Sequence, residues 1–127
     1  MIVYQSRIYR ADLQANPDVL YVFGDNVKRV GLGGQAKEMR GEPNAIGVAT
    51  KWNPGAYIDS YFSDEDLKKC CEIIWEDYYK VYSHLTYDKG TAVFPLDGIG
   101  TGLSRLPSLA PKVYEYIKLL GLGAQNE

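Results

Sequence analysis

The sequence has few of the residues that build disulfide frameworks, metal centres or membrane spans. It contains two cysteines, Cys70 and Cys71, and a single histidine, His84. Adjacent cysteines form no ordinary disulfide with each other, and these residues are too few for a structural zinc site. No apolar run approaches the roughly 20 residues of a membrane helix, and the N-terminus does not resemble a signal peptide. We therefore expect a reduced, cytoplasmic domain that binds no metal and has no membrane partner.

The chain also lacks an excess of either charge. Its 14 Lys and Arg residues face 16 Asp and Glu residues, which gives a formal net charge of -2. Because binding to a phosphate backbone depends on basic side chains, this balance argues against nucleic acid as a partner. A hydrophobic content of 46% and a length of 127 residues fit one globular domain over residues 1–127.

Strands and helices are expected to alternate along the chain. Apolar runs predict strands over residues 1–4, 20–23, 45–50 and 91–95, and the first of these is expected at a sheet edge. Helical periodicity and end signals predict helices over residues 35–40, 63–85 and 108–120. Residues 24–26 are expected to form a loop. This alternation predicts an α/β fold with a mixed, largely parallel sheet.

Two glycine clusters lie between a predicted strand and a predicted helix. They cover residues 31–34 (Gly-Leu-Gly-Gly) and 98–102 (Gly-Ile-Gly-Thr-Gly). In parallel sheets such loops meet at the carboxyl ends of the strands, and glycine lets the main chain approach a ligand closely. One cluster alone would indicate a tight turn, whereas two in the same context favour phosphate binding. Neither cluster has the Gly-Lys-Ser/Thr of a Walker A loop or the spacing of the dinucleotide fingerprint.

Taken in order, these segments resemble the macrodomain family, which binds ADP-ribose. The resemblance rests on residues 10–13 (Arg-Ala-Asp-Leu), 20–26, 31–36, 92–95 and 99–103, and the pattern resembles that of compact bacterial and phage variants. It implies a three-layer α/β/α fold that needs no cofactor. The implied partner is a small-molecule nucleotide of the ADP-ribose type, either free or attached to a macromolecule.

The resemblance also implies roles for individual residues. Asp12 would accept hydrogen bonds from adenine, and Asn26 would hold the distal ribose and help to place a water. Asp25, which departs from the family pattern, is the candidate base of a metal-independent hydrolase, so Asn26 and Asp25 form the expected catalytic pair. The expected ligand-binding residues are Asp12, Gly24, Gly31, Gly33, Gly34, Gln35, Thr50, Asp97, Gly98, Ile99, Gly100, Thr101, Gly102, Leu103 and Arg105.

Several of these assignments have a structural alternative. Asp12 fits a helix cap as well as an adenine contact, and Asp97 fits a turn as well as a ligand contact. Ser104 and Arg105 replace the residues that pack on the distal ribose in the family, although Arg105 could reach a phosphate. Lys51 is a further candidate to neutralise a phosphate. Three functions stay open: hydrolysis of an ADP-ribosyl bond or derivative, nucleotide binding without chemistry, and protein interaction on a macrodomain-like scaffold.

Overall fold

The chain folds around one parallel sheet. A computed structural model describes residues 1–125. The strands, in the spatial order β1-β4-β2-β3, are β1 (Ile2–Gln5), β4 (Ala92–Pro95), β2 (Leu20–Asn26) and β3 (Ala45–Lys51). All three pairings between them are parallel. The α/β prediction and the edge position of the first strand are therefore confirmed. The sequence predicted a mixed, largely parallel sheet. The four strands pair only in parallel, and the antiparallel contact is an isolated bridge between Lys51 and Tyr61.

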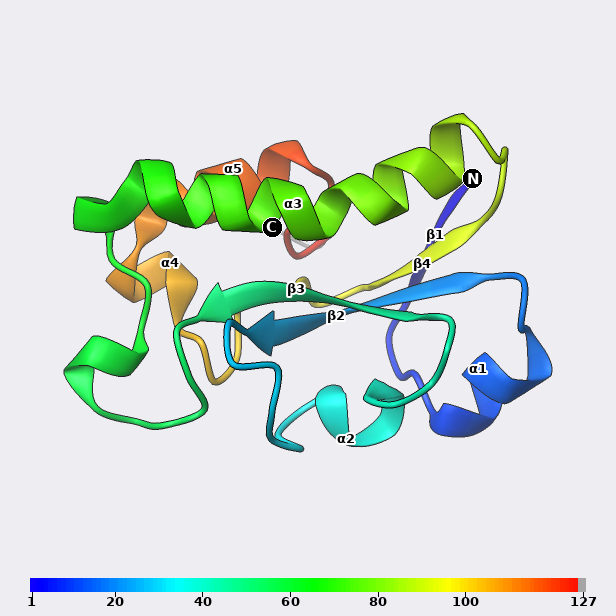
Figure 1. Cartoon of the computed structure of the whole chain (residues 1–127), viewed down its shortest axis with the longest axis horizontal. Helices are drawn as coiled ribbons and strands as arrows, with labels where there is room; N and C mark the ends of the chain where they lie inside the picture. Colours follow the sequence, from blue (N-terminus) through cyan, green and yellow to red (C-terminus); the bar gives the residue numbers. More distant parts are fainter. Residues whose placement is uncertain (126–127) are drawn as a thin grey trace.

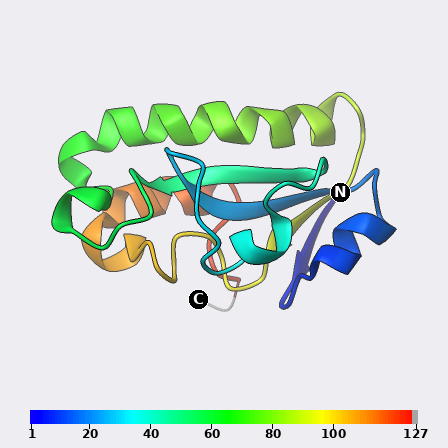
Figure 2. The same ribbon diagram turned by 60° about the horizontal axis from the view of Figure 1, so that its bottom comes forward.

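Helices cover both faces of this sheet. They are α1 (Arg10–Ala15), α2 (Ala36–Met39), α3 (Leu67–Thr86), α4 (Leu106–Leu109) and α5 (Pro111–Leu119), with 3-10 turns at Ile58–Ser60 and Asp64–Asp66. Figure 1 shows α1 and α2 on one side of the sheet and α3 and α5 on the other, and Figure 2 shows α3 running along the sheet. The result is the expected three-layer arrangement. No helix within residues 1–125 combines the length and the apolar character needed to cross a bilayer.

Each face of the sheet has its own hydrophobic core. Successive residues of β2 point to opposite faces, so Val22 packs toward α3 and α5, and Phe23 packs toward α1 and α2. Both side chains are buried. A strand covered on both faces needs a continuous apolar run rather than an alternating one, and this explains the composition of residues 20–23.

The helix α1 was not predicted, and most predicted element ends shift by one residue. Three differences are larger. Residues 24–26, predicted as a loop, continue β2 because they pair with β3. The predicted helix over residues 108–120 is two helices, because Pro111 lacks the N–H that would continue α4 and instead begins α5. Ser63 caps a 3-10 turn by accepting a hydrogen bond from the N–H of Glu65, and α3 begins only at Leu67.

Candidate ligand-binding site

A pocket of about 340 Å³ lies at the carboxyl ends of β2 and β4. It is lined by the end of β2, by the loop before α2, by Lys51 and Pro54, and by the loop between β4 and α4. Figure 1 shows this last loop at the same end of the sheet as the arrowheads of β2 and β3. The two glycine loops therefore meet at one pocket, at the edge of a parallel sheet where ligands commonly bind.

Most of the expected site residues line this pocket. They are Gly24, Asp25, Asn26, Gly31, Gly33, Gly34, Gln35, Gly98, Ile99, Gly100, Thr101, Gly102 and Leu103. The expected residues that do not line it are Asp12, Thr50, Asp97 and Arg105. The pocket is also lined by residues that the sequence did not single out, namely Val30, Leu32, Ala36, Arg40, Pro54 and Pro95, and by Lys51 and Ser104, which were not among the expected ligand-binding residues.

The first glycine loop, residues 30–35, exposes a run of main-chain donors. Within the described part of the chain, no hydrogen bond uses the N–H groups of residues 31–35. Gly31 and Gly34 have positive φ angles of 99° and 56°, a conformation that few other residues adopt without strain. A Cβ on Gly33 would lie 2.9 Å from Cδ1 of Leu103 in the opposite loop, so the two loops approach each other closely at this point.

The second glycine loop, residues 96–105, has the same property. The N–H groups of residues 100–104 have no hydrogen-bond partner among the residues that the structure describes. Gly98 and Gly100 have φ angles of 81° and 80°, and a Cβ on Gly100 would overlap Leu106 of α4. The loop is closed by Thr101, whose Oγ1 donates a hydrogen bond to the Asp97 carbonyl at 2.9 Å. Consecutive unpaired N–H groups of this kind are the usual main-chain binding site for an anion.

Lys51 brings a positive charge to the pocket. It is 8% exposed, and its Nζ donates a hydrogen bond to the Gly55 carbonyl at 2.6 Å and lies 4.7 Å from the centroid of the Tyr61 ring. Among residues 1–125, no carboxylate lies within ion-pair distance of this ammonium group. A buried charge without a counter-ion is costly, so Lys51 would be stabilised by an anionic ligand.

The other charges at the pocket cancel each other. The Asp25 side chain is 3% exposed, and Arg40 contacts it at both oxygens: Nη2 lies 2.5 Å from Oδ1, and Nη1 lies 3.2 Å from Oδ2. The N–H of Asn26 also donates to Oδ1 at 2.8 Å. Gly47 on β3 leaves the space that the Asp25 carboxylate fills. With both oxygens engaged, Asp25 is arranged to anchor Arg40, and this geometry does not favour the general-base role expected for it.

Arg40 joins this ion pair to the first glycine loop. It follows the last residue of α2, and its guanidinium donates to the Gly31 carbonyl at 2.8 Å and to the Val30 carbonyl at 3.3 Å. It also lies over the Phe23 ring at 5.6 Å. These contacts fix the orientation of two successive peptide groups in the loop. Local sequence gives no signal for this role, because a basic residue at a helix end is favoured by the helix dipole alone.

Asn26 presents a buried acceptor without a donor. The residue is 7% exposed, and its Nδ2 donates to the Val30 carbonyl at 2.7 Å. Its Oδ1 is the one buried side-chain N or O atom of the described residues that has no hydrogen-bond partner. Because an unsatisfied buried acceptor is destabilising, a ligand hydroxyl or N–H at this atom would stabilise the site.

The expected residues outside the pocket have structural contacts. Asp12 Oδ2 accepts hydrogen bonds from the N–H of Tyr9 at 2.9 Å and from Gln5 Nε2 at 3.0 Å, so the helix-cap alternative is confirmed. Thr50 is fully buried and donates to the Asp25 carbonyl at 3.0 Å. Its Oγ1 also pairs with the Ser104 hydroxyl, which links β3 to the second glycine loop.

The remaining two expected residues shape the second loop through the main chain. The Asp97 carbonyl accepts the Thr101 hydroxyl, and the Asp97 side chain is exposed. Arg105 adopts a left-handed conformation, with φ of 52°, at the start of α4. These contacts give Asp97 and Arg105 structural roles at the loop ends, outside the pocket lining.

The fold and the pocket define a parallel α/β domain with a pocket at the carboxyl ends of its strands. A family of unknown function, DUF7831, matches residues 3–119. The chain belongs to this family, and all the residues that line the pocket fall within the matched range. Neither a curated protein nor a solved structure matches the chain.

Proposed function

We propose that the chain binds a nucleotide diphosphate of the ADP-ribose type, with the diphosphate between the two glycine loops. The observation that carries the proposal is that residues 31–35 and 100–104, whose main-chain N–H groups have no partner among the described residues, line one pocket together with Lys51. The resemblance of the ordered segments to macrodomains supports the same ligand. The two cysteines are free thiols, which supports a cytoplasmic location for the protein.

The charges at the pocket suit a diphosphate. Anionic oxygens form stronger hydrogen bonds with N–H donors than neutral acceptors do, and two loops provide donors from two sides. The Asp25 carboxylate would repel a phosphate if it were free, but Arg40 neutralises it. Lys51 therefore sets the net charge of the lining, which is positive.

The geometry supports binding more strongly than hydrolysis. A general base must reach the attacking water, and the Asp25 side chain is 3% exposed and paired with Arg40 through both oxygens. We therefore propose a module that binds ADP-ribose, free or attached to a macromolecule, without cleaving it. Chromatography of ADP-ribose derivatives incubated with the protein would reveal any turnover. Turnover would show that the protein is a hydrolase and would contradict the proposal of binding without cleavage.

Calorimetry with ADP-ribose tests the binding proposal. We expect a dissociation constant on the order of 1–100 µM. Replacing Lys51 by Met removes its charge but keeps most of its length. A hydrogen bond to a charged group contributes about 1.5–3 kcal/mol, so Lys51→Met should weaken binding by about tenfold or more.

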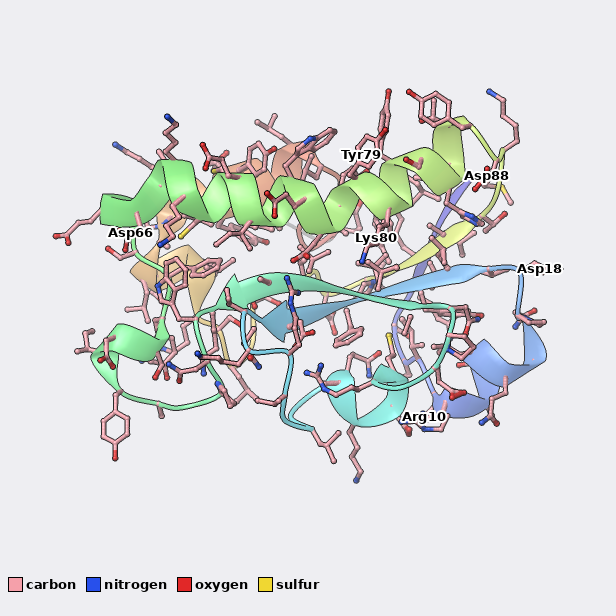
Figure 3. All side chains as sticks on the ribbon, in the orientation of Figure 1. Arg10, Asp18, Asp66, Tyr79, Lys80 and Asp88 are labelled. Atoms are coloured by element: carbon pink, nitrogen blue, oxygen red, sulfur yellow. The ribbon has the colours of Figure 1, made fainter. Side chains whose placement is uncertain are left out.

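The control for this experiment is Lys80→Met, an identical change of charge on α3 (Figure 3). Lys80 is exposed and outside the pocket lining, so its variant should bind ADP-ribose as the unmodified protein does. No heat with ADP-ribose at about 1 mM, or equal affinities for the two lysine variants, would contradict the proposal.

A further inference from the structure

Each polar side chain of the pocket has at least one contact within the protein, which limits how freely it can turn toward a ligand. Asp25 pairs with Arg40, Lys51 donates to Gly55, and Asn26 Nδ2 donates to Val30. The remaining ones also have partners within the chain: Gln35 with Ile8, Thr101 with Asp97, and Ser104 with Thr50. Strong selection of a nucleobase needs side-chain donors and acceptors matched to its edge. The orphan acceptor Asn26 Oδ1 is buried at the end of β2, where it would meet the sugar and not a base at the mouth of the pocket.

The mouth of the pocket is apolar. Val30 and Leu32 from the first glycine loop and Leu103 from the second are exposed and line the pocket, as does Pro54. Aliphatic surface contacts the face of a base without distinguishing its edge, and every base has such a face. A base placed at this mouth would gain hydrophobic contact but little discrimination.

The size of the pocket also favours placing the base at its mouth. A volume of about 340 Å³ lies near the lower end of the roughly 300–1,000 Å³ range of small-molecule sites. A diphosphate with its attached sugar would use most of this space, and the base would lie at the mouth. The carboxylate that the family resemblance assigns to adenine belongs to Asp12, which caps α1 and lies outside the pocket lining.

Resting on the proposed function, we infer that the site recognises the diphosphate and its sugar and is indifferent to the base. The ligands would then form a chemical class, the nucleoside diphosphate sugars, and the identity of the nucleoside would not decide which member binds. Binding energy would come from the N–H groups of the two glycine loops and from Lys51, which contact groups common to the whole class.

Calorimetry with three ligands that differ only in the base tests this inference. The probes are ADP-ribose, GDP-ribose and the hypoxanthine analogue IDP-ribose, with adenosine as a ligand that keeps adenine and lacks the diphosphate. We expect the three dissociation constants to agree within about threefold and adenosine to show no binding at about 1 mM. Binding of ADP-ribose more than about tenfold tighter than the other two, or measurable binding of adenosine, would overturn the inference and leave the proposed function standing. Failure of all three diphosphates to bind would overturn both.

Two variants sharpen the same test. Asp12→Asn keeps an oxygen that can accept from the Tyr9 N–H, and it should change the affinity for ADP-ribose by less than about threefold; a tenfold loss would show that Asp12 reads adenine. Leu32→Ser at the mouth should weaken all three ligands by the same factor, whereas a base-dependent loss would contradict the inference. The control is Leu119→Ser, a more exposed leucine on α5 outside the pocket, which should change none of the affinities.

Discussion

The ion pair between Asp25 and Arg40 allows a quantitative prediction for Arg40→Gln. The Asp25 side chain is 3% exposed, and that of Arg40 is 22% exposed. Removing the guanidinium leaves a buried carboxylate whose remaining contacts are the Asn26 N–H and the more distant Arg29, at 3.9 Å. Breaking a buried pair in this way costs about 3–5 kcal/mol. Because Arg29 compensates in part, we expect Arg40→Gln to lower the free energy of unfolding by about 3 kcal/mol.

Removing the carboxylate of the pair should lower the free energy of unfolding by less than removing the guanidinium does. In Asp25→Asn, the guanidinium of Arg40 is partly exposed and can be hydrated, and it keeps its hydrogen bonds to the Val30 and Gly31 carbonyls. We expect a loss of about 1–2 kcal/mol. The double variant removes both charges and leaves no unpaired one. Its loss of unfolding free energy should therefore be about 1–2 kcal/mol smaller than the sum of the two single losses, which is the non-additivity expected for residues in contact.

Urea unfolding of the four proteins at neutral pH measures these differences, provided that the slopes with denaturant agree. Arg10→Gln is a suitable control because its pair with Glu42 is more exposed, at 35% for the Arg10 side chain, and it should cost about 1 kcal/mol or less. Figure 3 shows Arg10 at the periphery of the molecule. Additive losses in the cycle, or a larger loss for Asp25→Asn than for Arg40→Gln, would refute the assignment of Asp25 as the buried anchor.

Two further predictions concern the loops and the helices. Gly100→Ala should lower the free energy of unfolding by about 2–4 kcal/mol, because its φ is positive and its Cβ would overlap Leu106. Gly102→Ala meets nothing within 4 Å and should leave thermal stability unchanged; equal melting temperatures for the two variants would contradict this account. Burial raises the pKa of the Cys70 thiol from 9.0 to about 12, so the folded state gains stability below pH 9 that it loses as the pH rises toward 12. Between pH 9 and 12, the free energy of unfolding should fall more steeply in the unmodified protein than in Cys70→Ala, by up to about 1.4 kcal/mol per pH unit. Parallel curves of free energy against pH for the two proteins would refute the prediction.

The fold was predictable because its strands are short apolar runs that local periodicity reveals. Residues 20–23 and 92–95 are buried on both faces, and nothing but a central strand explains such runs between turn residues. The end of β2 was not predictable by the same means. Gly24, Asp25 and Asn26 have the composition of a turn, and they extend the strand because β3 pairs with them and Arg40 neutralises the carboxylate. Both of these causes lie far along the chain.

The site was predictable to the extent that topology alone determines it. Parallel strands have their carboxyl ends at the same edge of the sheet. Two glycine clusters that each follow a strand were therefore expected at the same edge. Topology does not predict which side chains contact one another across the fold. Arg40 reaches Asp25 and the first glycine loop from the end of α2, and Asp12 is bound within its own turn by Tyr9.

Three positions, Asp25, Arg40 and Gly47, act together beside the pocket. Asp25 brings a carboxylate close to main-chain donors that suit an anion, which would by itself oppose phosphate binding. Arg40 cancels that charge with two contacts and uses its remaining donors on the loop carbonyls, and Gly47 leaves the room in which the carboxylate lies. The acid is thereby converted from a source of repulsion into the support of the loop that would bind the ligand. A carboxylate beside a phosphate site therefore need not indicate a catalytic base, because its partners decide whether it is available to take a proton.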